Sequence, residues 1–355
     1  ASSDTTPMRV SIIGCGAIAG THVAAVRAAG QEICALCDID REKAGQFAQR
    51  FGIDAPVYAD YAELLERERP DAVHICTPHH LHAEMCCLAL RKNIHVLCEK
   101  PLCITLGELD EVTRAVRESR ATLGVCLQNR YEPNLLRLRG LAAEHGVTAG
   151  MGIVAWKRDE AYYRSGEWRG RKATEGGGVM INQALHTLDL LQWICGMPSH
   201  VTAHLGNDHL SGVIEVEDTA TALFELPGGG KLSFFATTAA GADFPAQVQL
   251  VTADKRILYA DSSLLAEQGR LVARQLNDPA AGKRVWGTGH RELVADFYRC
   301  IGAERPFPIG AEEAGKVIRL ILAMYASNGN RVAVPEAPGV GALGDAFCKM
   351  LPPPR

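Results

Sequence analysis

Short apolar runs alternate with helix-like segments over the first third of the chain. Strands are predicted at 8–13, 33–37, 72–76, 94–97 and 122–127, and helices at 17–29, 41–51 and 79–92. The apolar runs are nearly continuous, as expected of strands that are covered on both faces. Gly52 is a typical stop for the helix before it. Strands alternating with helices predict an α/β domain with a doubly wound parallel sheet over residues 8–127.

The pattern changes after residue 128. Strand-like runs lie at 147–156, 201–204, 219–226, 232–237, 247–252 and 256–259, and helices are predicted at 179–194, 290–301 and 311–325. The segment Pro227-Gly228-Gly229-Gly230 predicts a hairpin turn between two of these strands. A second, α+β domain with a largely antiparallel sheet is therefore predicted for residues 128–355. Residues 1–7 are small and polar, and we expect them to be disordered or foreign to the native chain.

Composition narrows the class of protein. The chain has 355 residues, enough for two domains, with 47% hydrophobic and 22% charged residues. A net charge of -4 gives no reason to expect nucleic acid or an anionic membrane as a partner. No apolar run reaches the roughly 18 residues of a membrane helix. No basic segment with an apolar core opens the chain, so we expect a cytoplasmic location.

The cysteines and clustered histidines do not predict a metal site. Most of the 12 cysteines lie in apolar runs, where they act as small buried hydrophobes in a reducing compartment. Cys34-x-x-Cys37 alternates along a predicted strand and lacks a second pair. His79, His80 and His82 have no nearby carboxylate to complete a ligand set. We therefore predict no bound metal.

A glycine turn between the first strand and the first helix predicts a dinucleotide site. Gly14-Cys15-Gly16-Ala17-Ile18-Ala19 fits G-x-G-x-x-A, in which the glycines allow a tight turn and a close approach of the backbone to a pyrophosphate. Asp38 ends the second strand about 20 residues later, where a carboxylate accepts the ribose hydroxyls and repels a 2′-phosphate. The pattern favours NAD over NADP, although Arg41 leaves the second alternative open.

Several motifs in a fixed order resemble one enzyme family. Cys76-Thr77-Pro78-His79-His80-Leu81-His82 and His95-Val96-Leu97-Cys98-Glu99-Lys100-Pro101 are similar to the glucose–fructose oxidoreductase, inositol dehydrogenase and rhizopine-catabolism family (Gfo/Idh/MocA). The resemblance continues over nearly the whole chain, through Gln128-Asn129-Arg130-Tyr131, Tyr162-Tyr163, Trp168-Arg169-Gly170, Gly176-Gly177-Gly178, His186 and Asp189. It implies an N-terminal Rossmann domain and a C-terminal α/β domain with an open sheet. It also implies a nicotinamide cofactor, a sugar, cyclitol or glycoside substrate, and a homodimer or homotetramer formed through the C-terminal sheet.

The resemblance also assigns residues to the cofactor. It implies that the glycine turn binds the pyrophosphate and that Asp38 binds the adenosine ribose. Glu99 and Lys100 are expected to lie beside the nicotinamide. The full set is Gly14, Gly16, Ala17, Ile18, Asp38, Thr77, Pro78, His82, Glu99, Lys100, Gln128, Trp168 and Arg169.

The family's catalytic histidine corresponds to His186. Many members carry an aspartate four residues before it, where this chain has Asn182. An amide cannot accept a proton, so we expect Asp189, on the same predicted helical face, to do part of that work. We expect His186 to act as acid and base and Lys100 to polarise the reacting hydroxyl or relay its proton, although these two roles can be exchanged. The expected substrate-binding residues are Lys100, Arg130, Tyr163, Asn182 and His186.

Three functions remain open at this stage. The first is NAD-dependent oxidation of a secondary hydroxyl, in which the nicotinamide takes the hydride and a base takes the proton. The second is a redox glycosidase, which oxidises a sugar, eliminates the aglycone, adds water and reduces again with no net NADH. The third is a non-catalytic dinucleotide sensor, which Asn182 keeps open. The basic loop that contains Arg158, Arg164 and Arg169 is either solvated or binds an anionic substrate group.

Overall fold

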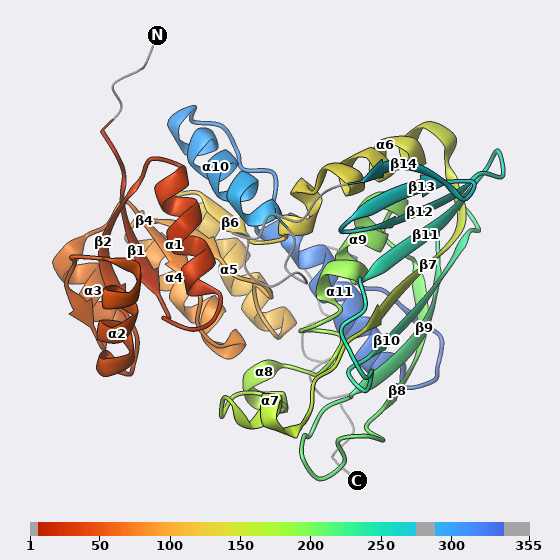
Figure 1. Ribbon diagram of the computed structural model, residues 1–355, viewed down its shortest axis with the longest axis horizontal. Coiled ribbons are helices and arrows are strands. Elements are labelled where there is room, and N and C mark those ends of the chain that lie inside the picture. Colours follow the sequence, from red (N-terminus) through yellow and green to blue (C-terminus); the bar gives the residue numbers. More distant parts are fainter. Residues whose placement is uncertain (1–5, 275–287, 337–355) are drawn as a thin grey trace. The chain divides into compact units, whose positions relative to one another are not determined.

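The computed structural model describes residues 6–274 and 288–336, and the chain divides into two compact units (Figure 1). The first unit comprises Ala1–Cys103, Glu108–Gln128 and Thr288–Ala314. The second comprises Ile104–Gly107, Asn129–Gly287 and Gly315–Arg355. The first unit thus takes a segment from far downstream, which a single cut after residue 127 does not include. Residues 1–5 of the predicted N-terminal extension lie outside the described part.

The first unit contains the predicted parallel sheet, with six strands in the order β3-β2-β1-β4-β5-β6. All four residues of β4 are buried, as are all but the first residue of β1, because helices cover both faces. The order reverses between β1 and β4, which is where open α/β sheets bind ligands. The strands are β1 (Arg9–Ile13), β2 (Glu32–Cys37), β3 (Val57–Tyr58), β4 (Ala72–Ile75), β5 (His95–Cys98) and β6 (Leu123–Val125).

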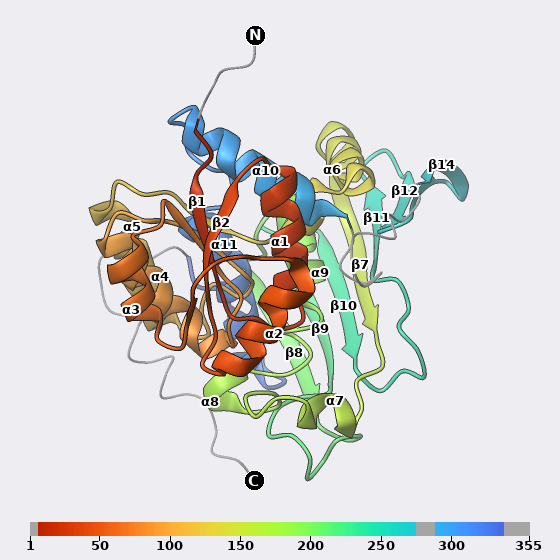
Figure 2. The same cartoon turned by 60° about the vertical axis from the view of Figure 1, so that its left-hand side comes forward.

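Helices lie on both faces of this sheet. In Figure 2, α1 (Ala19–Ala28), α2 (Arg41–Phe51) and α10 (Gly289–Gly302) lie on one face. The helices α3 (Tyr61–Glu68), α4 (His82–Arg91) and α5 (Leu106–Glu118) lie on the other. α10 packs against α1, although more than 250 residues separate them in the chain. Gly52 ends α2 in the left-handed conformation, as predicted.

The second unit is built on a nine-stranded sheet in the order β14-β13-β12-β11-β7-β10-β9-β8-β15. All neighbours are antiparallel except β7 and β10. β9 and β10 form the predicted hairpin, with buried and exposed residues in alternation. The strands are β7 (Val147–Ala155), β8 (His200–Gly206), β9 (Thr219–Glu225), β10 (Lys231–Thr237), β11 (Gln247–Thr252), β12 (Ile257–Asp261), β13 (Leu264–Glu267), β14 (Arg270–Arg274) and β15 (Val332–Ala333).

Helices cover one face of the nine-stranded sheet. α6 (Pro133–His145) packs against β11, β12 and β13, and α9 (Leu185–Cys195) packs against β7 and β11. The opposite face carries partly exposed apolar side chains from five strands, which the strand register places on the same side of the sheet: Met151, Leu223, Phe235, Ile257 and Leu271. The remaining helices are η1 (His79–Leu81), η2 (Gln128–Tyr131), α7 (Glu160–Arg164), α8 (Lys172–Glu175) and α11 (Ala311–Ser327).

The helix predicted over 179–194 is wrong at its start, because α9 begins only at Leu185. The carboxylate of Glu217 accepts hydrogen bonds from the backbone N–H groups of Gly178 and Met180, at 3.0–3.1 Å. A Cβ at Gly178 would lie 1.9 Å from the carbonyl oxygen of Glu217. This buried contact holds the segment before α9 as turns, so Asn182 lies ahead of the helix that carries His186.

Two expectations from composition can be compared with the structure. In the part of the chain that the structure describes, the cysteines are free thiols and most of them are buried. No helix among these same residues is long and apolar enough to cross a bilayer.

Candidate functional site

The turn between β1 and α1 fits the phosphates of a dinucleotide. Gly14 has a φ of +88°, and a Cβ there would lie 2.6 Å from the carbonyl oxygen of Cys76, so only glycine is tolerated. A Cβ at Gly16 would meet no atom within 4 Å, which leaves room beside this backbone. The N-cap residue Ile18 makes no side-chain capping bond, so the positive end of α1 is available to a phosphate.

Asp38 is tied directly to this turn. Its Oδ2 accepts a hydrogen bond from the Cys15 N–H at 2.9 Å, and its Oδ1 accepts one from the Asp40 N–H at 3.0 Å. The cation beside this carboxylate is Lys43, with Nζ 3.4 Å from Oδ2, whereas Arg41 donates to the carbonyl of Val57. The position suits the predicted contact with the adenosine ribose, and that contact stays a prediction.

His82 joins the two loops that follow β4 and β5. Its Nδ1 lies 2.5 Å from the carbonyl oxygen of Pro101, and its Nε2 lies 2.8 Å from that of Thr77. The ring is 1% exposed, and burial lowers its pKa while the two carbonyl contacts oppose that change. The two loops follow the carboxyl ends of the neighbouring parallel strands β4 and β5, and parallel sheets of this kind bind their ligands at the carboxyl ends of the strands. His82 therefore holds Thr77 and the Lys100-Pro101 segment in fixed positions.

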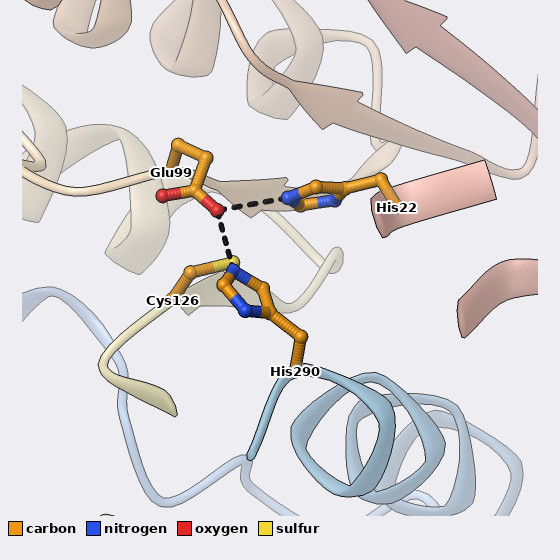
Figure 3. Close-up of side chains that lie close together, drawn as sticks. All are labelled: His22, Glu99, Cys126 and His290. Atoms are coloured by element: carbon orange, nitrogen blue, oxygen red, sulfur yellow. Dashed lines mark hydrogen bonds and ion pairs between the residues drawn. The ribbon is translucent and has the colours of Figure 1, made fainter. Parts of the chain in front are cut away.

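A buried cluster surrounds Glu99 (Figure 3). Its Oε1 lies 2.9 Å from Nε2 of His22, in α1, and 2.9 Å from Nε2 of His290, in α10. The Sγ of Cys126 completes a group whose polar atoms all lie within 4.8 Å of one another. The sequence motifs gave no sign of this cluster, because its members come from four distant segments.

The cluster extends into a chain of hydrogen bonds. His22 Nδ1 lies 2.8 Å from His74 Nδ1, and His74 Nε2 lies 2.7 Å from the hydroxyl of Tyr298. Burial lowers the pKa of both histidines, so each neutral ring donates once and accepts once. With the Tyr298 hydroxyl as the first donor, the assigned order runs from Tyr298 through His74 and His22 to Glu99.

This order keeps Glu99 ionised. Burial opposes the charge, but the hydrogen bonds from His22 and His290 hold the pKa of Glu99 well below its usual range. Its other oxygen, Oε2, accepts the backbone N–H of Lys100 at 3.2 Å. Burial raises the pKa of the Cys126 thiol well above its usual value, which disfavours the thiolate that a metal would need. The hydrogen bonds therefore account for this group, and the absence of a metal stays a prediction.

In the second unit, Asn182 and Tyr162 form a hydrogen-bonded group. The Tyr162 hydroxyl accepts a hydrogen bond from Arg169 Nη1 at 2.5 Å and longer ones from Asn182 and Gln183, at 3.4 and 3.3 Å. The Arg169 guanidinium stacks on the rings of Tyr162 and Trp168, at 4.4 and 4.6 Å from their centroids. Arg169 and Trp168 are the pair predicted to close over the cofactor, and here they form one stack.

Glu175 is a buried carboxyl that the sequence did not single out. Its Oε1 accepts the Asn182 Nδ2–H at 2.6 Å, and its Oε2 accepts the Gly170 N–H at 2.5 Å. The residue is 0% exposed. Burial raises the pKa of Glu175 to about 7, while the bonds from Gly170 and Asn182 and the charge of Arg169 oppose that rise.

Arg130 and Tyr163, both predicted to bind substrate, have structural partners. Arg130 makes two hydrogen bonds to Asp189, at 2.8 and 2.7 Å, and both side chains are almost fully buried. Because both oxygens of Asp189 accept from Arg130, this contact argues against the expectation that Asp189 assists His186. Tyr163 packs in a small apolar cluster with Leu210, Ile214 and Val216. Contact of Arg130 or Tyr163 with substrate stays a prediction.

Two of the residues that matter here could have been suspected from the sequence. Tyr162 neighbours Tyr163 in a quoted motif, and Glu175 directly precedes the glycine run. Neither residue has a periodicity or spacing that separates it from an ordinary loop residue. His22, His74, His290 and Tyr298 carry even less signal, since apolar faces of helices and strands often include a histidine.

Comparison with known proteins agrees with these features. Residues 8–127 match the model of the oxidoreductase family with an NAD-binding Rossmann fold, and residues 147–257 match the GFO/IDH/MocA C-terminal domain. D-glucoside 3-dehydrogenase of Escherichia coli is 28% identical over 248 residues, which cover 64% of this chain and 69% of the relative. Inositol 2-dehydrogenase of Rubrobacter xylanophilus is 29% identical over 195 residues, which cover 54% of this chain and 53% of the relative.

A solved structure extends the likeness to nearly the whole chain. The WlbA dehydrogenase from Chromobacterium violaceum, in complex with NADH and UDP-GlcNAcA, superposes with a TM-score of 0.81 at 26% identity. The superposition covers 94% of this chain and 97% of that one. The two family models together span more than half of the chain, in the order that the sequence motifs predicted. The chain therefore belongs to the Gfo/Idh/MocA family of oxidoreductases, and its first unit is an NAD-binding Rossmann domain.

Proposed function

We propose that this protein is an NAD-dependent dehydrogenase that oxidises a secondary hydroxyl group of a sugar, cyclitol or glycoside. The observation that carries the proposal is the match of both family models to a chain whose glycine turn fits a dinucleotide. The relatives named as D-glucoside 3-dehydrogenase and inositol 2-dehydrogenase support a ring hydroxyl as the reacting group. The name of the first favours oxidation at C3 of a glycoside.

In the proposed reaction, different groups take up the hydride and the proton of the substrate. NAD, when bound, accepts the hydride from the substrate carbon. His186 acts as general base toward the hydroxyl proton, because an imidazole titrates near neutral pH. Lys100 polarises the same hydroxyl or relays its proton, and Asn182 holds the substrate by hydrogen bonds. Glu99, through its bond to the Lys100 backbone, supports the position of that lysine.

We also propose a homodimer or homotetramer formed through the open face of the nine-stranded sheet. Five exposed apolar residues from five strands share that face: Met151, Leu223, Phe235, Ile257 and Leu271. An apolar sheet face of this kind is normally covered by another protein surface. A second copy of the chain is the occupant that the family resemblance favours.

Absorbance of NADH, measured during incubation with candidate substrates, tests the proposed reaction. NAD and NADP are each offered with methyl β-D-glucopyranoside, myo-inositol and p-nitrophenyl β-D-glucopyranoside. An increase in NADH absorbance with one of these substrates supports the proposed dehydrogenase activity. Release of p-nitrophenol without net NADH would instead indicate the redox glycosidase. Tight NAD binding with neither signal over a broad panel of sugars, cyclitols and glycosides would contradict the dehydrogenase and favour a dinucleotide sensor.

A further inference from the structure

Glu175 lies beside the residue that replaces the usual aspartate, yet the reaction proposed above does not use it. It ends the short helix α8, and Gly176 follows it in the left-handed conformation. Both oxygens of its carboxylate accept hydrogen bonds, Oε2 from the Gly170 backbone and Oε1 from the Asn182 side chain. Its burial and these two short contacts make it a fixed part of the group around Asn182.

The contact determines which way the Asn182 amide points. A carboxylate only accepts hydrogen bonds, so the atom of Asn182 that faces Glu175 at 2.6 Å must be Nδ2. The same Nδ2 faces the Tyr162 hydroxyl at 3.4 Å. The carbonyl oxygen of Asn182 therefore points away from Glu175, and an amide oxygen accepts hydrogen bonds.

Protonation of Glu175 at Oε1 would remove this constraint. A proton on Oε1 would meet the Asn182 N–H, so either the amide turns over or the contact breaks. Among the groups that act on Glu175, the Arg169 guanidinium, the Gly170 N–H and the Asn182 amide favour the charge. Burial and the carboxyl of Glu217 oppose it. The balance leaves Glu175 with a raised pKa, so both protonation states are reachable near neutral pH.

We propose that Glu175 is a positioning residue, whose carboxylate orients the Asn182 amide so that its carbonyl oxygen accepts a substrate hydroxyl. Proton uptake by Glu175 releases that orientation. The site thereby keeps a carboxylate that acts through an amide, in place of the aspartate that Asn182 replaces. This inference rests on the proposed function only in taking Asn182 as a substrate ligand.

The protonation of Glu175 can be measured without any substrate. Infrared difference spectra of the full chain, recorded as a function of pH, report the carbonyl band of a protonated carboxylic acid. Wild type should show a band that disappears around pH 7, and Glu175→Gln should lack it. Glu215→Gln, which removes a nearby exposed carboxyl, should keep it. Persistence of the band in Glu175→Gln, or its absence from wild type, would overturn the inference.

The same spectra test the link to Asn182. Asn182→Ala removes a hydrogen bond that stabilises the carboxylate, so the Glu175 band should persist to higher pH than in wild type. An unchanged midpoint would show that the two side chains are not coupled. A folded Asn182→Ala variant is recognised by a circular dichroism spectrum that matches wild type.

Kinetics then test the positioning role, with methyl β-D-glucopyranoside and NAD as the probe pair. Glu175→Gln should raise KM roughly fivefold to tenfold, as expected for the loss of one oriented hydrogen bond, and should flatten the dependence of KM on pH near neutrality. The exchange Glu175→Gln with Asn182→Asp returns a carboxylate and an amide to the pair and should recover most of the loss. Wild-type KM and pH profile in Glu175→Gln would reject the role. If the probe is not turned over by wild type, the choice of substrate has failed, and the infrared titration still decides the inference.

Discussion

His22 and Glu99, 77 residues apart in the chain, are joined by a buried 2.9 Å hydrogen bond between Nε2 and Oε1. The bond links α1, which follows the glycine turn, to the segment that carries Lys100. His22 also bonds His74, so the helix after the glycine turn and the segment before Lys100 belong to one hydrogen-bond network. The position of Lys100 therefore depends on this network through the bond of its backbone N–H to Glu99.

Replacing His22 with leucine should destabilise the protein by about 1–3 kcal/mol, because a buried carboxylate loses one of its imidazole donors. The pKa of Glu99 should rise toward its usual value for the same reason. The midpoint of unfolding, followed by calorimetry at pH 7, measures the effect. His209→Leu replaces an exposed histidine and should change the midpoint little. An equal loss in both variants would contradict the role of the network.

Replacing Asp38 should change the choice of cofactor. Asp38→Asn removes the charge that repels a 2′-phosphate while an amide oxygen can still accept the Cys15 N–H. NADPH should then bind more tightly, because the neighbouring Lys43 attracts its 2′-phosphate. The affinity for NADH should fall less than it does in Asp38→Ala. Fluorescence titrations with NADH and NADPH compare the three proteins. A wild-type preference for NADPH would refute the assignment of Asp38.

Lys100→Ala and His186→Ala should each lower turnover by roughly 10²–10⁴-fold, the range expected for loss of a proton-transfer group. NADH affinity should stay close to that of wild type in the histidine variant, because His186 is assigned to the substrate. Stopped-flow measurement of NADH formation with a glucoside or inositol substrate separates this step from product release. A variant with unchanged turnover removes its residue from the mechanism.

The raised pKa of Glu175 predicts how stability depends on pH. The folded state binds the proton with a pKa of about 7, against 4.5 for an unperturbed glutamate. Between these values the folded state holds more protons than the unfolded state, so this group's contribution falls as pH rises and is constant above about pH 7. The total change is roughly 3 kcal/mol.

The comparison of wild type with Glu175→Gln isolates that contribution. The difference between their unfolding free energies should shift in favour of the glutamine variant from pH 4.5 to about 7. Glu99 acts in the opposite direction because its pKa is lowered in the folded state. Its contribution to stability is present at pH values above the pKa of an unfolded glutamate and is lost as pH falls. Both proteins contain Glu99, so its contribution cancels in the difference between their unfolding free energies. A constant difference across this window would contradict the raised pKa of Glu175.

A charge on the open sheet face should disrupt the proposed oligomer. Phe235 is 39% exposed on β10, beside Leu223 and Met151 on the same face. Phe235→Glu should shift the protein toward the monomer in light scattering coupled to size exclusion. Phe244→Glu alters a phenylalanine that is 63% exposed outside the strands and should leave the assembly unchanged. A wild-type monomer would refute the oligomer outright.

The sequence by itself determined the parts of the structure that depend on local chain geometry. Continuous apolar runs separated by helices predicted the parallel sheet, and the turn residues 227–230 predicted the hairpin of β9 and β10. The glycine turn and Asp38 could be placed at the ends of β1 and β2, because a G-x-G turn after a strand has few conformations. The start of α9 could not be predicted, since it depends on a hydrogen bond from Gly178 to the distant Glu217.

Only the tertiary structure decided how the charged groups behave. Glu99 and Glu175 are both buried glutamates, and one has its pKa lowered and the other raised. The difference arises because two imidazoles donate to Glu99, whereas Glu175 receives two amide N–H groups that offset its burial only partly. These partners lie up to 191 residues away in the chain. Their distance and desolvation are set by packing, and no local pattern of residues records them.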